Sequence, residues 1–247
     1  MSGHSKWSQI KHKKAKTDAV RGRVFTKLIR EITIAARAGG GDPAGNPRLR
    51  LAIQTAKESN MPAENIQRAI KKGTGELEGM VLEEFSYEGY GPAGVALIID
   101  VVSDNRNRTT GEVRHALTKH NGSLGENGCV AWNFDTRGVI AVDRKRVDED
   151  TLMTAALEAG ASDVNDEGDV WEVYTDPADL SVVSEALKAS GIAYETAEVQ
   201  RVPRTFVKLA GDDARKVIKL VEALEDLDDV QRVSANFDIP DEILQQG

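Results

Sequence analysis

The N-terminal segment carries the residues best suited to binding a polyanion. Between Lys6 and Arg30 there are nine basic residues and one acid, and the run GHSKWSQIKHKKAK places a tryptophan among lysines. Lys and Arg neutralise phosphates, while an aromatic ring can stack on a base. We therefore predict that this segment binds nucleic acid, through Lys6, Trp7, Lys11, His12, Lys13, Lys14, Lys16, Arg21, Arg23, Lys27 and Arg30. The alternative is a solvated helix face with Trp7 packed against a neighbouring domain.

The formal charge is segregated along the chain. Residues 1–75 contain sixteen Lys and Arg against five Asp and Glu, a net charge of +11. Since the whole chain has a net charge of -8, the remaining 172 residues carry -19. The first part attracts polyanions and the rest repels them. We expect nucleic acid, either DNA or ribosomal RNA, as a partner of the basic part, and basic ribosomal proteins as candidate partners of the acidic part.

A second candidate phosphate contact lies in the motif DNRNRTTGEVRHALTKH. Arg106 and Arg108 come close to the start of a predicted helix, where free backbone N–H groups favour anions. Asn105, Asn107 and Thr109 are candidate caps. The residue chemistry alone favours the other interpretation of this motif, a capped turn with two solvated arginines.

The sequence lacks the common catalytic and metal-binding patterns. It contains no G-x-x-x-x-G-K-[ST], G-x-G-x-x-G, G-x-S-x-G or H-E-x-x-H motif. His115 and His120 are five residues apart, which puts them on different faces of a helix. We expect no enzymatic activity, no cofactor, no metal and no small-molecule substrate.

Acidic residues are concentrated in the motif EALEDLDDV. They could be arranged around a magnesium ion, but their positions are typical of the solvated side of a helix, and docking of a basic protein is a further alternative. These acids are Glu222, Glu225, Asp226, Asp228 and Asp229.

The composition favours a cytoplasmic protein. The longest uncharged apolar stretch, Gly94 to Ile99, is far shorter than the ~20 residues that cross a bilayer. The single cysteine, Cys129, cannot form an internal disulfide, and we expect it to behave as a small buried hydrophobic residue.

Three short helices are predicted at the basic end. Apolar residues recur every four positions from Val20 to Ala36, which is typical of an amphipathic helix that ends at Gly39. Asn46 and Pro47 predict the cap and first turn of a second helix, and a third is predicted from Pro62 to Gly73. These helices make a basic domain over residues 1–78.

The remaining sequence predicts two α+β domains. We expect strands at 83–87, 94–102 and 129–134 and a helix at 109–120, with the continuously apolar 94–102 segment central and covered on both faces. Residues 138–201 predict the order strand-helix-strand-strand-helix-strand, which is ferredoxin-like. The strands and helix expected in 205–237 have no partners of their own.

The simplest arrangement is a ferredoxin-like domain inserted into a discontinuous middle domain. The strands after residue 205 then complete the sheet begun at residues 83–134. The predicted fold is a multi-domain α and β protein: a three-helix domain at 1–78, a middle α+β domain at 79–134 and 205–247, and an inserted ferredoxin-like domain at 135–204.

Long motifs across the whole chain resemble the YebC/PmpR family, which is related to the mitochondrial translational activator of cytochrome c oxidase. The clearest departure is Ala93, where the family's loop usually reads G-P-G-G. The motifs are GHSKWSQIKHKKAKTDAVRGRVFTKLIREITIAARAGGGDP, NPRLRLAI, NMPAENIQRAIKKGTG, YEGYGP, DNRNRT, EVRHAL, GENGCVAW and LEDLDDVQRVSANFDIP.

The resemblance implies both a fold and two candidate functions. The implied fold has a three-helix N-terminal domain and two α+β domains, of which the last is inserted in the middle one. Members are usually labelled DNA-binding transcriptional regulators, and bacterial and mitochondrial members are also connected with translation at the ribosome, where they help the synthesis of difficult sequences. The charge pattern favours binding to phosphate backbone over reading of base edges, so both functions remain open.

Overall fold

The structure, a computed structural model, describes residues 18–79 and 81–240, with side chains from residue 22 onward. The described chain forms two compact units. One comprises Asn133–Phe206, and the other comprises the described residues up to Trp132 together with those from Val207. No helix among the described residues is long and apolar enough to cross a membrane.

Three helices build the N-terminal part of the second unit: α2 (Asp18–Gly39), α3 (Pro47–Glu58) and α4 (Ala63–Thr74). Their buried residues, among them Ile32, Leu49 and Ile66, form one hydrophobic cluster. Asn46 caps α3 as predicted, because its Oδ1 accepts the backbone N–H of Leu49 at 3.0 Å. The prediction of three short helices is confirmed.

The third helix runs past Gly73, where the sequence predicts its end. Its left-handed terminating residue is Gly75, with a φ of 82°. Gly73 instead allows α2 and α4 to approach closely, since a Cβ placed on it would lie 2.4 Å from the carbonyl oxygen of Thr33. The close approach of the two helices therefore requires a glycine at this position.

An antiparallel sheet follows, in the order β3-β1-β2-β9. Its strands are β1 (Glu83–Tyr90), β2 (Ala96–Ser103), β3 (Ser123–Leu124) and β9 (Val230–Ala235). The predicted central strand is β2, which is buried at every position except Asp100. Residues Leu97 to Val101 pair with β9, which confirms that a strand from the end of the chain joins the sheet begun by β1 and β2. The strand predicted just after residue 205 does not join this sheet, contrary to the prediction.

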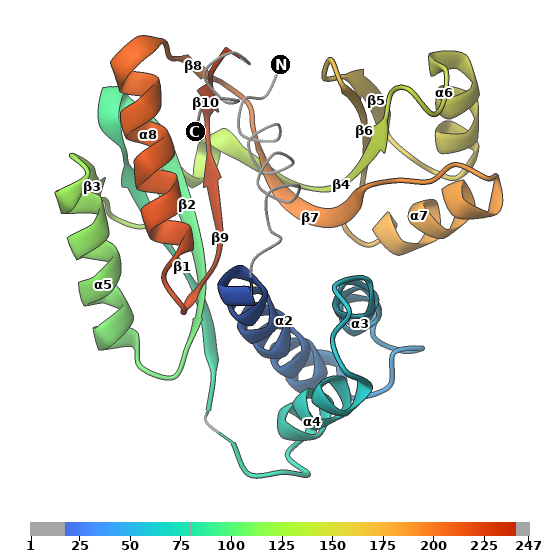
Figure 1. The fold of residues 1–247 in the computed structure, drawn as a ribbon, viewed down its shortest axis with the longest axis horizontal. Coiled ribbons are helices and arrows are strands. Elements are labelled where there is room, and N and C mark those ends of the chain that lie inside the picture. The colour runs from blue at the N-terminus through green and yellow to red at the C-terminus, as the bar shows by residue number, and fades with distance from the viewer. Residues whose placement is uncertain (1–17, 80, 241–247) are drawn as a thin grey trace. The chain divides into compact units, whose positions relative to one another are not determined.

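Two helices, α5 (Arg106–Lys119) and α8 (Gly211–Glu225), cover one face of this sheet (Figure 1). The core between them contains Leu97 and Ile99 of β2, Leu117 of α5 and Leu220 of α8. A short parallel pair, β8 (Val207–Lys208) with β10 (Phe237–Asp238), adjoins it.

The predicted strand at 129–134 is wrong. Residues Ala131–Asn133 form a 3-10 turn, and the next strand, β4, begins at Phe134. The physical reason is the buried carboxylate of Glu88, which accepts the backbone N–H groups of Gly128, Val130 and Ala131 at 2.6–2.8 Å. With those donors already bound, the segment cannot enter a strand ladder.

The unit Asn133–Phe206 has the ferredoxin-like order β4 (Phe134–Asp143), α6 (Glu149–Glu158), β5 (Asp163–Asp166), β6 (Val170–Thr175), α7 (Leu180–Ala189), β7 (Thr196–Pro203). All strand pairs are antiparallel, in the order β5-β6-β4-β7. The observed fold is the predicted multi-domain α and β arrangement. The exact three-domain boundaries stay a prediction.

Candidate nucleic-acid interface

The described structure includes only part of the predicted N-terminal binding segment. Seven of the candidate residues lie outside the described residues: Lys6, Trp7, Lys11, His12, Lys13, Lys14 and Lys16. Arg21 lies in α2, but its side chain is not described. Their role in binding stays a prediction.

Three candidate residues share one face of α2, and all contact the segment Glu225–Asp229, which begins at the last residue of α8. Arg23 pairs with the carboxylate of Asp226 at 3.1 Å. Lys27 donates to the carbonyl oxygen of Glu225 at 2.8 Å. Arg30 donates to the carbonyl oxygen of Asp228 and pairs with the carboxylate of Asp229 at 2.8 Å. The spacing of four and three residues places the three cations on one side of the helix.

Asp229 is the centre of this contact. Its side chain is 3% exposed, and its Oδ2 atom accepts hydrogen bonds from Thr109 (2.6 Å), Arg108 (2.7 Å) and Ser103 (2.9 Å), while Oδ1 receives Arg30. Burial alone would raise the pKa of Asp229, but these hydrogen bonds outweigh burial and lower it below its ordinary value. Asp229 is therefore an ionised group that joins α2, α5 and β2.

A second polar contact joins the helices to the sheet through Arg48 of α3. Its guanidinium binds Glu31 of α2 (2.7 and 3.0 Å) and Glu84 of β1 (2.7 and 2.9 Å). The hydrogen bonds to Glu84 and then to Glu31 raise the pKa of Arg48. Arg48 therefore holds one carboxylate from the helical part and one from the sheet.

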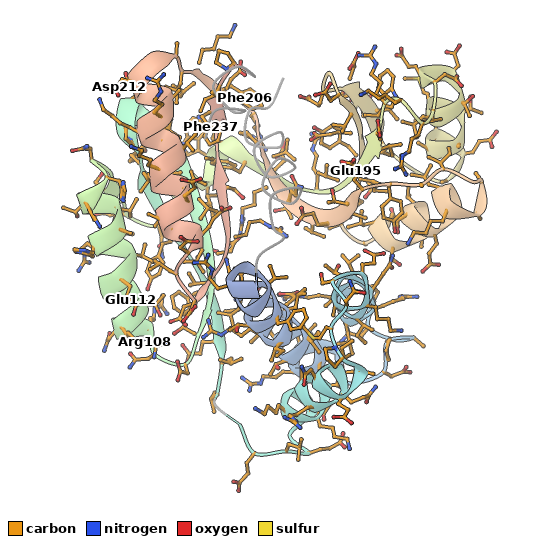
Figure 2. All side chains as sticks on the ribbon, viewed as in Figure 1. Arg108, Glu112, Glu195, Phe206, Asp212 and Phe237 are labelled. Atoms are coloured by element: carbon orange, nitrogen blue, oxygen red, sulfur yellow. The ribbon has the colours of Figure 1, made fainter. Side chains whose placement is uncertain are left out.

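Arg106 and Arg108 occupy a capped turn. The Oδ1 atom of Asn105 accepts the N–H of Arg108 at 3.1 Å, which confirms Asn105 as the cap of α5. The Arg108 side chain is bound to Asp229 and Asp104, and these contacts raise its pKa. Glu112 lies one turn along α5 from Arg108 (Figure 2), and its Oε1 atom is 3.9 Å from the Nε atom of Arg108. Arg106 stacks over the ring of Phe85 at 4.6 Å.

Three exposed cations on α4 were counted in the sequence but not singled out as contacts. They are Arg68, Lys71 and Lys72, opposite the buried face of Ile66 and Ile70. Within the part of the chain that the structure describes, none of the three takes part in an ion pair. The signal in the sequence is the strong separation of apolar and basic positions along this helix.

Two exposed aromatic rings contact the loop that includes the GENGCVAW motif: Trp132 of the loop itself and Tyr90, the last residue of β1. Trp132 is 65% exposed, and its Nε1 donates to the carbonyl oxygen of Cys129 at 3.0 Å. The hydroxyl of Tyr90 donates to the same oxygen at 3.1 Å. Cys129 itself is half-buried, and burial, followed by the charge of Glu88, raises the pKa of its thiol. A thiol in this environment is a poor nucleophile.

Family models cover nearly the whole chain. The model described as the TACO1/YebC protein N-terminal domain matches residues 5–76, and that of the TACO1/YebC second and third domain matches residues 82–237. The chain belongs to the TACO1/YebC family.

Curated relatives and a solved structure agree with this membership. A "probable transcriptional regulatory protein" of Geobacter sulfurreducens is 58% identical, with 100% of this chain and 99% of the relative covered. One with the same description from Desulforapulum autotrophicum is 55% identical, with 98% of each covered. The crystal structure of a conserved hypothetical protein from Aquifex aeolicus matches with a TM-score of 0.85 at 54% identity, covering 94% of this chain and 96% of that one.

The contact between α2 and Glu225–Asp229 joins two motifs that carry the resemblance to the TACO1/YebC family, the opening basic motif and LEDLDDV. Ala93, which departs from the family's usual glycine, has a φ of 57°. This left-handed conformation suits glycine better than alanine, so the departure costs backbone strain in the loop.

Proposed function

We propose that this protein is a non-enzymatic, nucleic-acid-binding regulator of gene expression. Its curated relatives carry the name probable transcriptional regulatory protein, which supports DNA as the target. The observation that carries the proposal is the charge of the N-terminal part. Residues 1–75 have a net charge of +11, and Arg68, Lys71 and Lys72 of α4 are exposed. Such a surface binds phosphate backbones with little dependence on sequence.

The second candidate function is an RNA-binding translation factor associated with the ribosome. The observation in its favour is the net charge of -19 on the remaining 172 residues. An acidic body is repelled by bare duplex DNA, whereas on a ribosome it could face basic proteins while the basic part lies on RNA. The acids of this body would include Glu222 and Asp228, which make no described ion pair.

Co-sedimentation with ribosomes and binding to duplex promoter DNA, measured over the same salt series, distinguish the two targets. Binding to DNA that depends on sequence, without ribosome association, would exclude the translation factor. Ribosome association that survives salt concentrations abolishing DNA binding would exclude the transcriptional regulator. Absence of binding in both assays would refute the proposal as a whole.

The basic segment is tested by replacing Lys11, Lys13 and Lys14 with Glu. We expect this variant to lose nucleic-acid binding without unfolding the α+β domains. If about six cations of the wild-type protein meet phosphates of a duplex, its log-log salt slope is about -5. The matched control replaces three exposed lysines of the sheet domain with Glu: Lys119, Lys208 and Lys219. Equal losses in both variants would indicate a general charge effect and contradict the assignment of the binding segment.

A further inference from the structure

The acidic segment Glu225–Asp229 presents to α2 the same kinds of atoms that a nucleic-acid backbone would. Arg23, Lys27 and Arg30 bind two carboxylates and two carbonyl oxygens there. The carbonyl oxygens lie at and just beyond the C-terminus of α8, where the helix dipole is negative. Phosphate oxygens are anionic acceptors as carboxylate oxygens are, and arginine and lysine bind both.

The contacts described between the helical part (α2, α3 and α4) and the sheet part are polar, and each part has its own hydrophobic core. The residues buried among α2, α3 and α4 form one hydrophobic cluster, and those between the sheet and helices α5 and α8 form another. The ties described between these parts include the α2 contacts and the Arg48 bridge from Glu31 to Glu84. The pairs of Arg23 and Arg48 are partly exposed, and such pairs are weak and are screened by salt, whereas the pair of Arg30 with Asp229 is buried.

Release of α2 would leave no buried charge without a partner. When Arg30 leaves the Oδ1 atom of Asp229, the Oδ2 atom keeps Thr109, Ser103 and the cation of Arg108. Arg30, with its side chain 18% exposed in the contact, would gain solvent or a phosphate instead. Breaking a buried ion pair is usually costly because one charge loses its partner, and this arrangement avoids that situation.

We infer that Glu225–Asp229 is an intramolecular competitor of nucleic acid for the basic face of α2. In the closed state, which is the arrangement seen in the structure, the segment binds Arg23, Lys27 and Arg30. When α2 is released, a phosphate backbone binds those three cations instead. This inference rests on the proposed nucleic-acid binding and adds its regulation: only backbones that displace the acidic segment gain the α2 contacts.

Two substitutions that remove the same charge separate competition from a general electrostatic effect. Asp226→Asn removes the partner of Arg23. Asp228→Asn, two residues away, alters an exposed side chain whose carboxylate makes no described ion pair, and the backbone oxygen that binds Arg30 remains. Both variants are expected to fold, because both side chains are exposed, and their urea midpoints verify this.

Binding is measured by fluorescence anisotropy with a labelled 20-nucleotide single-stranded RNA of mixed sequence and, separately, a 20-base-pair DNA duplex. Loss of one exposed ion pair weakens the closed state by a factor of roughly 2 to 5. We therefore expect Asp226→Asn to bind the preferred probe roughly 2- to 5-fold more tightly than Asp228→Asn does. The Asp228→Asn variant measures the effect of the lost charge alone.

A distance measurement follows the release directly. In a Cys129→Ser background, spin labels are attached to cysteines at two exposed positions, Thr55 of α3 and Thr118 of α5. The distance distribution between the labels should shift when the RNA is added to the wild-type background. It should shift in the same direction without RNA in Asp226→Asn, but not in Asp228→Asn.

The outcomes distinguish the inference from the function on which it rests. Probe binding that is equal in the two variants, with an unchanged distance distribution, would overturn the competition and leave nucleic-acid binding intact. Absence of binding by the wild-type protein and by both variants would overturn the proposed function together with the inference.

Discussion

At the scale of single residues, Asp229 binds side chains that were candidates for contacting phosphate. Its carboxylate receives Arg30, a predicted nucleic-acid contact, and Arg108, a possible secondary phosphate contact in the sequence. The acids of EALEDLDDV look equivalent in the sequence, because nothing local distinguishes Asp228, which is exposed, from Asp229, which is buried. The difference arises where the chain turns from α8 into β9 and carries Asp229 against Ser103 and Thr109.

Replacement of Asp229 with Asn tests this role. The amide cannot stabilise Arg30 and Arg108 as the carboxylate does, and its NH2 group cannot accept the hydroxyl hydrogen bonds. We expect the free energy of unfolding to fall by about 3 kcal/mol or more, measured by urea denaturation at pH 7. Asp228→Asn is the control, and its exposed side chain should change stability by less than about 0.5 kcal/mol. Equal effects of the two substitutions would contradict the central role of Asp229.

The stability difference between the wild-type protein and Asp229→Asn should depend on pH. The folded-state pKa of Asp229 lies below the value of about 3.9 typical of an unfolded chain. A carboxyl with a lowered pKa stabilises the fold fully above the unfolded pKa, and this contribution disappears as the pH falls through the folded pKa. The stability difference between wild type and Asp229→Asn should therefore stay constant from pH 7 to about 5 and shrink below about pH 4.

At the scale of elements, the helices followed the sequence closely because local signals specify them. Asn46 and Pro47 define the start of α3, and the apolar stripe that recurs every four residues defines α2. The ends of elements moved where a tertiary contact intervened. The carboxylate of Glu88 accepts backbone N–H groups of the strand expected at 129–134, so that strand does not form. Gly73 lies within α4, where its lack of a side chain lets α2 pack against it.

Replacement of Gly73 with Ala tests the packing of α2 against α4. A Cβ at this position would meet the Thr33 carbonyl oxygen at 2.4 Å and the Ala36 Cβ at 2.7 Å. We expect a loss of about 1–3 kcal/mol in the free energy of unfolding, because the helices must move apart. Gly22→Ala is the matched control, since no atom lies within 4 Å of its Cβ, and alanine there should stabilise α2 by about 0.5–1 kcal/mol. A neutral Gly73→Ala variant would refute the packing argument.

At the scale of the whole molecule, the two ends of the ferredoxin-like unit lie next to each other. Asn133 accepts the N–H groups of Arg204 and Thr205 with its backbone and side-chain oxygens, at 2.7 and 3.0 Å. The sheet β3-β1-β2-β9 contains no strand from this unit. Both observations are expected of an inserted domain that completes its own core.

Excision of residues 134–204, with Asn133 and Thr205 joined by a short Gly-Ser linker, should leave the rest of the chain folded. The linker bridges a gap that the Asn133 hydrogen bonds already close, so little loop entropy is added. Circular dichroism and a cooperative urea transition measure the outcome, and the isolated segment 133–206 serves as the companion sample. Loss of cooperative unfolding in the excised protein would contradict the inserted-domain interpretation.

The sequence by itself determined the class of fold, the order of most elements and the segregation of charge, because periodicity, caps and formal charges are local properties. It also predicted that the strands after residue 205 complete the sheet begun at residues 83–134, since an unpaired strand requires a neighbour, and β9 does so by pairing with β2. Only the tertiary structure decided which cations remain available, because Arg23, Lys27 and Arg30 meet acceptors some two hundred residues away. Such distant pairing depends on how the chain folds back on itself, which no local pattern encodes.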